Sequence, residues 1–442
     1  MASPAKAQRR PEGASVLETL PALPLAIIIA KAGPRCAAAL ACASSTLRAA
    51  ASGEALWRHF CSDDFALDAP LAPGDLPLPS FKDAYKAWFQ SFGMYPLPLV
   101  KRVKIFWSSF RAWLCEYFPE GLRTLGEGVS EAEIAVAECN LGLVLPMPTK
   151  LLYRFCNGQL HIGRGEEVSY GVMGGYDYVH QRYTVRLLPL AHHAVQKNSN
   201  YIVVATSCFG EKIFLLDCAS GRLYVGTKYW NEEREIMACV PKATIRLAVD
   251  DDHGMPQDGF LLWLEEHLSR LQDGLIKVQS CKFPMLARHI SLYPVQLPYC
   301  SSASMHGIKV RASAVFAPEN SAFADYRCRY SYYFSIRLSL PEAFVVDGKW
   351  YSSFQLQSCH YTIQIGDEVL PYTCNYGGHG KCPLLRCGEE LFVYGCSISA
   401  ALEPGSVMGN LTLVPWRCGQ PRGSPFIADI APFPLHPPDY IF

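Results

Sequence analysis

The sequence NYGGHGKCPLLRC, at residues 375–387, brings together glycines, a lysine, a histidine and cysteines that could do chemistry. A phosphate-binding glycine loop ends in Gly-Lys and then needs a hydroxyl side chain, which holds the magnesium ion. Gly380 and Lys381 supply that ending, but Asn375 stands where the first glycine belongs and Cys382 where the hydroxyl belongs. We therefore exclude a phosphate-binding loop of this type.

The same stretch also holds side chains that could bind a metal. Structural zinc is bound by paired Cys or His ligands with two to four residues between them, and four residues separate Cys382 from Cys387. No second close pair completes the set among the other candidates, which are Cys359, His360, Cys374, His379 and Cys396. We therefore predict no bound metal and no cofactor, and interpret these cysteines as free thiols.

The rest of the chain offers no stronger catalytic pattern. It has no Gly-x-Ser-x-Gly elbow, no zinc-protease helix and no EF-hand loop. His192-His193 and the run Asp250–His253 lack partners at catalytic spacing and are typical of polar loops. We therefore predict a chain that is not an enzyme, and keep an enzyme with a cryptic nucleotide or metal site at 375–387 as an alternative.

A binding role suits the glycine-rich stretch better than a catalytic one. Glycines permit backbone angles that other residues resist, so the pattern predicts a turn between two strands. Gly378, His379, Gly380 and Lys381 then form a candidate recognition loop for a partner, without a role in catalysis.

Length and composition indicate several domains and no global charge. A chain of 442 residues is too long for one ordinary core. Lys+Arg and Asp+Glu are both 40, so nothing steers the chain toward nucleic acid, and half of the residues are hydrophobic. We predict a multidomain α+β protein that does not bind nucleic acid.

Cysteine usage and the apolar segments predict an intracellular protein. The 18 cysteines are scattered, many of them inside apolar runs, which favours free thiols in a reducing compartment. The longest apolar stretch, Ala22–Ala30, is far shorter than the ~20 residues a membrane helix needs. Glu12 and Glu18 lie between the basic opening and the apolar stretch and argue against a cleaved targeting peptide. We expect a location in the cytoplasm, the nucleus or both, away from membranes.

Three regions with different periodicity follow one another along the chain. Residues 15–60 are typical of a small helical module divided at Gly33-Pro34, and a Pro-rich stretch at 68–80 predicts an extended linker. Next come an amphipathic helix at 99–117, a helix capped by Ser130, three short β-runs between 201 and 227, and a helix capped by Asp258. Short turns between the β-runs predict antiparallel pairing.

Beyond residue 300 the hydrophobic period is two almost throughout. The runs IKVRASAVF and YSYYFSIRLSL alternate between apolar and other residues, and further short runs follow between Gly and Pro turns. This spacing predicts an all-β sandwich.

Each of the three regions resembles a known family. Leu20-Pro21, the helix through Ile27–Ile29 and the sequence ALWRHFC resemble an F-box. SEAEI, Glu138, LGLVLP and FCNGQ resemble a SUKH domain. FQLQSCHYTI, the glycine turn through Pro383, LFVYGCS, EPGSVMGNLTLVP and APFPL resemble an ApaG domain. The order of the three resembles the plant Skp-interacting F-box proteins and the animal F-box-only proteins of the same layout.

The resemblance implies a domain plan. It places an F-box at 15–62, a Pro-rich linker and connecting helix at 63–97, a SUKH-like domain at 98–275 and an ApaG domain at 298–438. The implied folds are a small helical F-box, an α+β SUKH domain with an antiparallel sheet, and an ApaG sandwich of immunoglobulin or fibronectin-III type.

The resemblance also implies a role in an SCF-type (Skp-cullin-F-box) ubiquitin ligase. The F-box would dock on the Skp adaptor and through it on cullin. The SUKH domain, the ApaG domain or both would recruit an unknown protein substrate for ubiquitination and proteasomal degradation. Candidate adaptor-binding residues are Leu20, Pro21, Leu25, Ile28, Leu40, Leu56 and Trp57.

We expect Trp57 to be the energetic anchor of that interface, because interface hot spots favour large aromatic side chains. We expect Pro21 and Leu25 to be exposed. Each candidate could instead belong to the core of the module. A scaffold or signalling protein that binds partners through its SUKH and ApaG domains, without a ligase role, is the first alternative.

Overall fold

The structure is a computed structural model that describes residues 16–160, 170–178, 181–193, 199–208, 210–229, 235–247, 254–280, 288–320, 330–375, 383–400, 404–417 and 420–442. The chain divides into two compact units, Met1–Ser108 and Ser109–Phe442. The division falls inside one long helix, and each unit is described by itself.

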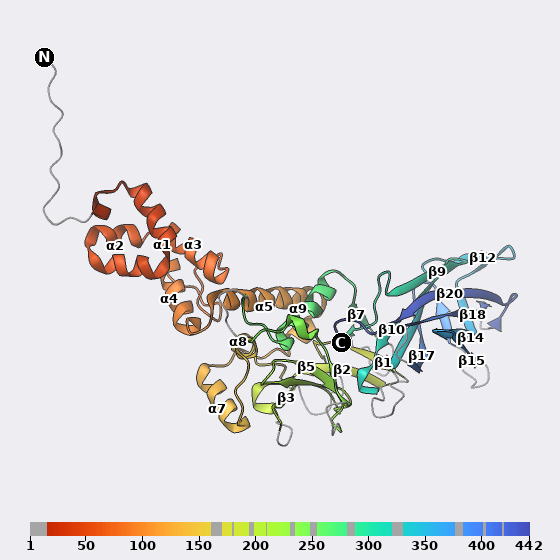
Figure 1. Cartoon of the computed structure of the whole chain (residues 1–442). Helices are drawn as coiled ribbons and strands as arrows, with labels where there is room; N and C mark the ends of the chain where they lie inside the picture. The colour runs from red at the N-terminus through yellow and green to blue at the C-terminus, as the bar shows by residue number, and fades with distance from the viewer. Residues whose placement is uncertain are drawn as a thin grey trace, which may run out of the picture. The chain divides into compact units, whose positions relative to one another are not determined.

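The first unit is helical (Figure 1). A kink at Gly33, with φ 86° and ψ 173°, divides its longest helix, as the sequence predicts. Only glycine adopts such angles at low cost. Because Gly33 lies near the middle of the helix, each part is about half as long as the whole. Its elements are η1 (Val16–Thr19), α1 (Ala22–Ala43), α2 (Ser45–Ala51), α3 (Glu54–Phe65), α4 (Phe81–Phe92) and the start of α5 (Leu97–Tyr117).

Aromatic side chains from α3 and α4 form the core of the first unit. The ring of Trp57 lies 5.5 Å from that of Phe60 and 5.4 Å from that of Tyr85, both edge-on. Phe65 contacts Tyr85 and Trp88 at 5.2 and 5.5 Å. Edge-on and tilted pairs at these distances add to the free energy of burial.

The Pro-rich stretch differs from the expected extended linker. The Ala72 N–H donates to the Leu76 carbonyl and the Leu78 N–H to the Pro70 carbonyl, both at 2.8 Å. The segment therefore folds back on itself and delivers α4 onto α3. There the Glu54 carboxylate accepts a hydrogen bond from the Phe81 N–H at 2.9 Å. Prolines restrict φ, but a turn satisfies that restriction as well as an extended chain does.

The second unit begins with an α+β region. After the end of α5 come α6 (Pro119–Leu122), α7 (Glu131–Leu141), α8 (Met147–Phe155), and later α9 (Gly259–Gln272). Ser130 forms a capping box with Glu133 at the start of α7, and Asp258 caps α9 by accepting from the Leu261 N–H. Both predicted caps are therefore confirmed. Each cap satisfies backbone N–H groups that the helix itself leaves unpaired.

Within the described residues, the sheet of this region has eight strands in the order β6-β5-β4-β3-β2-β1-β8-β7. β3, β4 and β5 pair antiparallel through short turns, as the sequence predicts, whereas β1 and β8 pair in parallel. The strands are β1 (Gly175–Tyr178), β2 (Gln181–Leu187), β3 (Tyr201–Ser207), β4 (Ile213–Asp217), β5 (Leu223–Gly226), β6 (Met237–Ala238), β7 (Lys277–Ser280) and β8 (Arg288–Ser291), with 3-10 turns η2 (Leu190–His192) and η4 (Lys242–Thr244).

The remainder of the second unit is built from antiparallel β-strands (Figure 1). Phe334 of β11 bridges its two main sheets, with ring distances of 5.0 Å to Tyr361 and 6.0 Å to Phe433. One sheet has the order β17-β11-β10-β9, and the other contains β15, β14, β18, β19, β16 and β20. The predicted β-rich character of the region beyond residue 300 is confirmed.

The bounds of these elements are β9 (Cys300–Met305), β10 (Ile308–Phe316), η5 (Pro318–Asn320), β11 (Tyr330–Ser339), β12 (Phe344–Val346), β13 (Lys349–Tyr351), β14 (Ser353–Ile365), β15 (Glu368–Asn375), β16 (Leu384–Arg386), β17 (Glu390–Ala400), β18 (Gly405–Arg417), β19 (Gln420–Pro421) and β20 (Phe426–Leu435).

Candidate partner-binding surfaces

The first half of α1 exposes an apolar face. Leu23, Ile27 and Ile28 are 72%, 49% and 43% exposed, while Leu25 and Ile29 on the other side of the helix are buried. Leu23 and Ile27 stand one helical turn apart and therefore share a face. We call Pro21, Leu23, Ile27 and Ile28 the α1 face. Large aliphatic side chains gathered on one exposed helix face are typical of a docking surface.

Among the described residues, α1 is the one helix long and apolar enough by length and composition to cross a membrane. The backbone argues for a different role, since Gly33 breaks the helix into two halves. A membrane span needs about 20 continuous helical residues. In addition, Leu25, Ile29, Ala37 and Ala41 are buried inside the helical unit. We therefore interpret α1 as a packed helix with one apolar face left open.

The structure separates the sequence candidates for adaptor binding into three groups. Pro21, which precedes α1, and Ile28 are exposed, and both belong to the α1 face. Leu20, Leu40 and Leu56 are half-buried. Leu25 and Trp57 are buried, each 4% exposed, so the expectation of an exposed Leu25 is wrong.

Trp57 is a core residue of the helical unit rather than an exposed anchor. Its indole N–H donates to the Ala51 carbonyl at 2.7 Å, and its ring packs against Phe60 and Tyr85. The sequence interpretation missed Leu23 and Ile27, which are the most exposed aliphatic side chains of α1. Their i, i+4 spacing does not single them out, because every residue from Ala22 to Ala30 is apolar.

The candidate recognition loop Gly378, His379, Gly380 and Lys381 lies outside the described residues. Its flanking strands are described, and both pair antiparallel with β14: Asn375 of β15 lies opposite Ser358, and Leu384 of β16 lies opposite Gln355. The glycine-rich stretch therefore connects two strands, as the sequence predicts.

The described parts of the chain contain no cluster of three or more His, Cys, Asp or Glu side chains that could hold a metal. Of the sequence candidates, Cys359 is buried in β14 opposite Cys374, and the Cys387 thiol donates to the Pro341 carbonyl at 3.4 Å. Cys382 and His379 lie outside the described residues.

The motif residues of the middle region have structural tasks. The Glu138 carboxylate accepts from the Leu145 N–H at 2.7 Å and pairs with Lys150 at 2.9 Å, which fixes the turn after α7. The Gln159 side chain is buried and joins three segments: its NH₂ group donates to Thr124 and Tyr170, and its oxygen accepts from the Val172 N–H. These contacts hold the turns of the middle region together.

The buried histidines and thiols of this region are also structural. His193, expected in a polar loop, is buried and lies 2.6 Å from the Tyr153 hydroxyl, and burial lowers its pKa to about 4. The run Asp250–His253 lies outside the described residues. Burial raises the pKa of the Cys156 thiol to about 12, so it stays protonated and unreactive near neutral pH.

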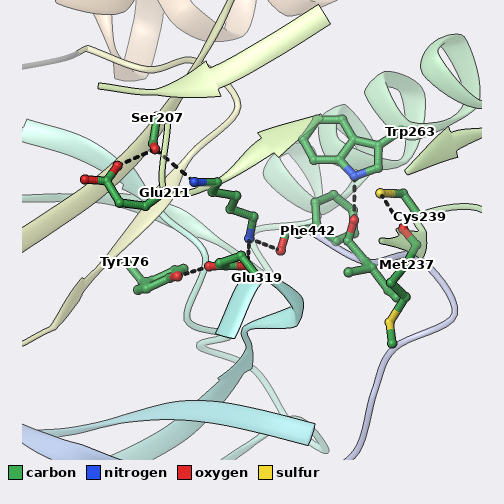
Figure 2. A network of polar contacts seen from close by, with 10 residues as sticks. Tyr176, Ser207, Glu211, Met237, Cys239, Trp263, Glu319 and Phe442 are labelled. Carbon is green, nitrogen blue, oxygen red and sulfur yellow. Dashed lines mark hydrogen bonds and ion pairs between the residues drawn. The ribbon is translucent and has the colours of Figure 1, made fainter. Parts of the chain in front are cut away.

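A buried polar network joins the middle region to the sandwich and to the last residues of the chain (Figure 2). The Lys212 ammonium lies 3.3 Å from the Glu319 carboxylate and donates to the Phe442 oxygen at 2.7 Å. The Tyr176 hydroxyl donates to the other oxygen of Glu319. The sequence carries no local signal for this network, because its members come from distant segments.

Comparison with known proteins first defines the class. A family model described as the ApaG domain matches residues 320–415, which covers β11 and most of the sandwich. Together with the helical unit at the other end, this defines a multidomain protein that contains an ApaG domain.

A curated relative then defines the family. F-box protein SKIP16 of Arabidopsis thaliana is 41% identical over 441 residues, which cover 96% of this chain and 100% of the relative. The chain belongs to this family of F-box proteins with an ApaG domain.

Two solved structures each match part of this chain. The putative ApaA protein from Bordetella pertussis is 22% identical, with a TM-score of 0.24, and the match covers 29% of this chain and 92% of that protein. A structural-genomics target protein is 16% identical with a TM-score of 0.25, and the match covers 30% and 88% of the two chains.

Proposed function

We propose that this protein is the substrate-recognition subunit of an SCF-type ubiquitin ligase, and that the α1 face docks on the Skp adaptor. The observation that carries the proposal is the open apolar face of α1 in a chain whose relative is named an F-box protein. Cullin is then reached through the adaptor, and partner subunits perform the ubiquitin chemistry.

The chemistry of the α1 face suits a helix-in-groove interface. Leu23, Ile27 and Ile28 present branched aliphatic side chains on two adjacent turns, with the rigid Pro21 at the start of the helix. Fully burying one such side chain contributes about 1.5–3 kcal/mol. An adaptor groove that covers the exposed parts of all three would therefore contribute about 2–5 kcal/mol to docking, and further contacts of the interface would offset the entropic cost of association.

The two other domains are proposed to recruit the substrate. We assign the α+β region to the SUKH fold and the sandwich to an immunoglobulin or fibronectin-III type topology. Support for the first comes from the Glu138 and Gln159 motifs, which organise its turns. The substrate would be degraded by the proteasome, and the protein would act inside the cell, in the cytoplasm, the nucleus or both.

Copurification tests the ligase role. The tagged full chain is coexpressed with a Skp adaptor and cullin, and the complex is analysed by size-exclusion chromatography. We expect a stoichiometric complex that contains all three proteins. A folded chain that elutes alone would overturn the proposal and favour the scaffold alternative, in which the same domains bind partners without a ligase.

A further inference from the structure

The last residues of the chain leave the sandwich and enter the middle region. β20 ends at Leu435, and residues 436–440 form neither helix nor strand. Ile441 and Phe442 are then buried, each 6% exposed. Figure 1 marks this end of the chain near α9, and ring contacts place Phe442 against that helix. Residues 436–440 are therefore a short connection that ends in two buried apolar residues, Ile441 and Phe442, which we call the anchor.

Phe442 fits a site formed by one face of α9. Its ring lies 4.8 Å from the ring of Trp263 and 5.9 Å from that of His267. The guanidinium of Arg270 covers the ring at 3.9 Å from its centroid. Trp263, His267 and Arg270 follow one another at i, i+4 and i+7, so they share a face of the helix. The site is thus an aromatic slot closed by a cation.

The backbone of the anchor is bound at three points. The Ile441 N–H donates to the Cys239 carbonyl at 3.0 Å, just after β6. The Trp263 indole N–H donates to the Ile441 carbonyl, and the Lys212 ammonium donates to the Phe442 oxygen, both at 2.7 Å. Figure 2 shows Trp263, Cys239 and Phe442 around this site. Contacts to backbone atoms and one ring recognise a short peptide segment rather than a folded surface.

We propose that the slot formed by Cys239, Trp263, His267, Arg270 and Lys212 is a peptide-binding site for an aliphatic residue followed by phenylalanine, and that the chain's own Ile441-Phe442 fills it in cis. A partner protein that presents the same pair of residues in an extended segment displaces the tail and binds there. The slot accepts such a segment because it buries one aliphatic side chain, contacts one ring and binds three backbone groups of the ligand.

The cis tail sets the affinity that a partner segment needs in order to displace it from the slot. A short connection gives the tail an effective concentration on the order of 1 mM. A peptide with a Kd of about 50 µM for the open slot therefore binds the wild-type chain about 20-fold more weakly. The proposal concerns the middle region and does not depend on the docking of α1.

A labelled peptide tests the slot directly. The probe is HPPDYIF, which corresponds to residues 436–442, and its binding is followed by fluorescence polarisation. The full chain carrying Phe442→Ala is expected to bind the probe at least tenfold more tightly than the wild-type chain does. The same probe carrying Phe442→Ala is expected to lose at least tenfold in affinity. Adding Arg270→Gln to the opened chain should also weaken binding several-fold, whereas Trp350→Ala, at an exposed residue of the sandwich, should change nothing.

The wild-type chain supplies a second measurement that needs no variant. At millimolar unlabelled peptide, hydrogen exchange of the chain's own Ile441 amide should accelerate, because the displaced tail loses its bond to Cys239. The proposal is overturned if unlabelled peptide, at five times the effective concentration of the tail, leaves the exchange rate of the Ile441 amide unchanged. A folded Phe442→Ala chain that binds both forms of the probe equally also overturns it. Neither readout involves an adaptor, so failure here leaves the ligase proposal standing, and the reverse holds too.

Discussion

Lys212 and Glu319 form an ion pair of 3.3 Å in which both side chains are only 1% exposed. Lys212 precedes β4 of the middle region, and Glu319 lies in η5, between the sandwich strands β10 and β11. Charges taken out of water are tolerated only when their partners compensate them. The pair therefore links the two regions through a contact that neither region could satisfy alone.

Removing one partner of this pair is expected to destabilise the second unit strongly. Glu319→Ala leaves the Lys212 ammonium buried without its carboxylate, and such changes cost about 3–5 kcal/mol. The measurement is the free energy of unfolding in urea, followed by tryptophan fluorescence. The double variant Lys212→Met/Glu319→Leu serves as control: it removes the uncompensated charge and should restore part of the loss, while the Tyr176 hydroxyl and the Phe442 oxygen still lose their partners. Equal stability of Glu319→Ala and wild type would contradict this account.

Stability is expected to fall in mild acid because of two buried histidines. Burial lowers the pKa of His193 and His267 from the usual 6.5 to about 4, so the unfolded chain takes up these protons first. Above pH 6.5 both histidines are neutral in the folded and in the unfolded chain, so they do not change the free energy of unfolding. As pH falls from 6.5 toward 4, the free energy of unfolding decreases by about 3 kcal/mol for each histidine. Urea unfolding at pH 7, 5.5 and 4.5 measures the slope. His267→Gln should flatten it, and an unchanged slope would count against the burial of a neutral imidazole.

Asp258 is expected to act with the opposite sign. Burial raises the pKa of its carboxyl from 3.8 to about 6, against hydrogen bonds from Leu261 and Thr149 that favour the charged form. A raised pKa contributes stability that is present below pH 3.8 and lost as pH rises through 6. Asp258→Asn removes this counter-slope, so the fall in stability between pH 6.5 and 4 should become steeper than in wild type. A variant with a shallower acid slope would show that the sign is wrong. Asparagine still caps a helix, which keeps α9 intact.

Trp57→Ala is expected to weaken folding of the helical unit rather than remove a contact to a partner. The change deletes a buried ring and the hydrogen bond to Ala51, at a cost of about 3–5 kcal/mol. Thermal unfolding of the helical unit measures the effect, and Trp57→Phe should recover part of it. If Trp57→Ala unfolds normally but no longer binds the adaptor, then Trp57 would be an interface residue after all.

The sequence predicts those features whose signal is local. Caps at Ser130 and Asp258 depend on neighbouring residues, and the period of two in β10 and β11 is visible along each strand. The orientation of α1 had no such signal. ALPLAIIIA is apolar on every side, so its periodicity could not tell that Leu25 faces inward and Leu23 outward. Lys212 and Glu319 were missed for a different reason, since only the tertiary fold brings them together.

The α1 face is the central claim, and calorimetric titration of purified full-length chain with purified Skp adaptor tests it most directly. Leu23→Asp/Ile27→Asp places two charges in the proposed interface, and Val136→Asp makes the same kind of change at an exposed apolar residue of α7. The account predicts that the double variant stays folded and loses at least about 100-fold in affinity, or about 2.7 kcal/mol, whereas Val136→Asp binds within twofold of wild type. An unchanged Kd for the folded double variant, or no binding by the wild-type chain, would contradict it.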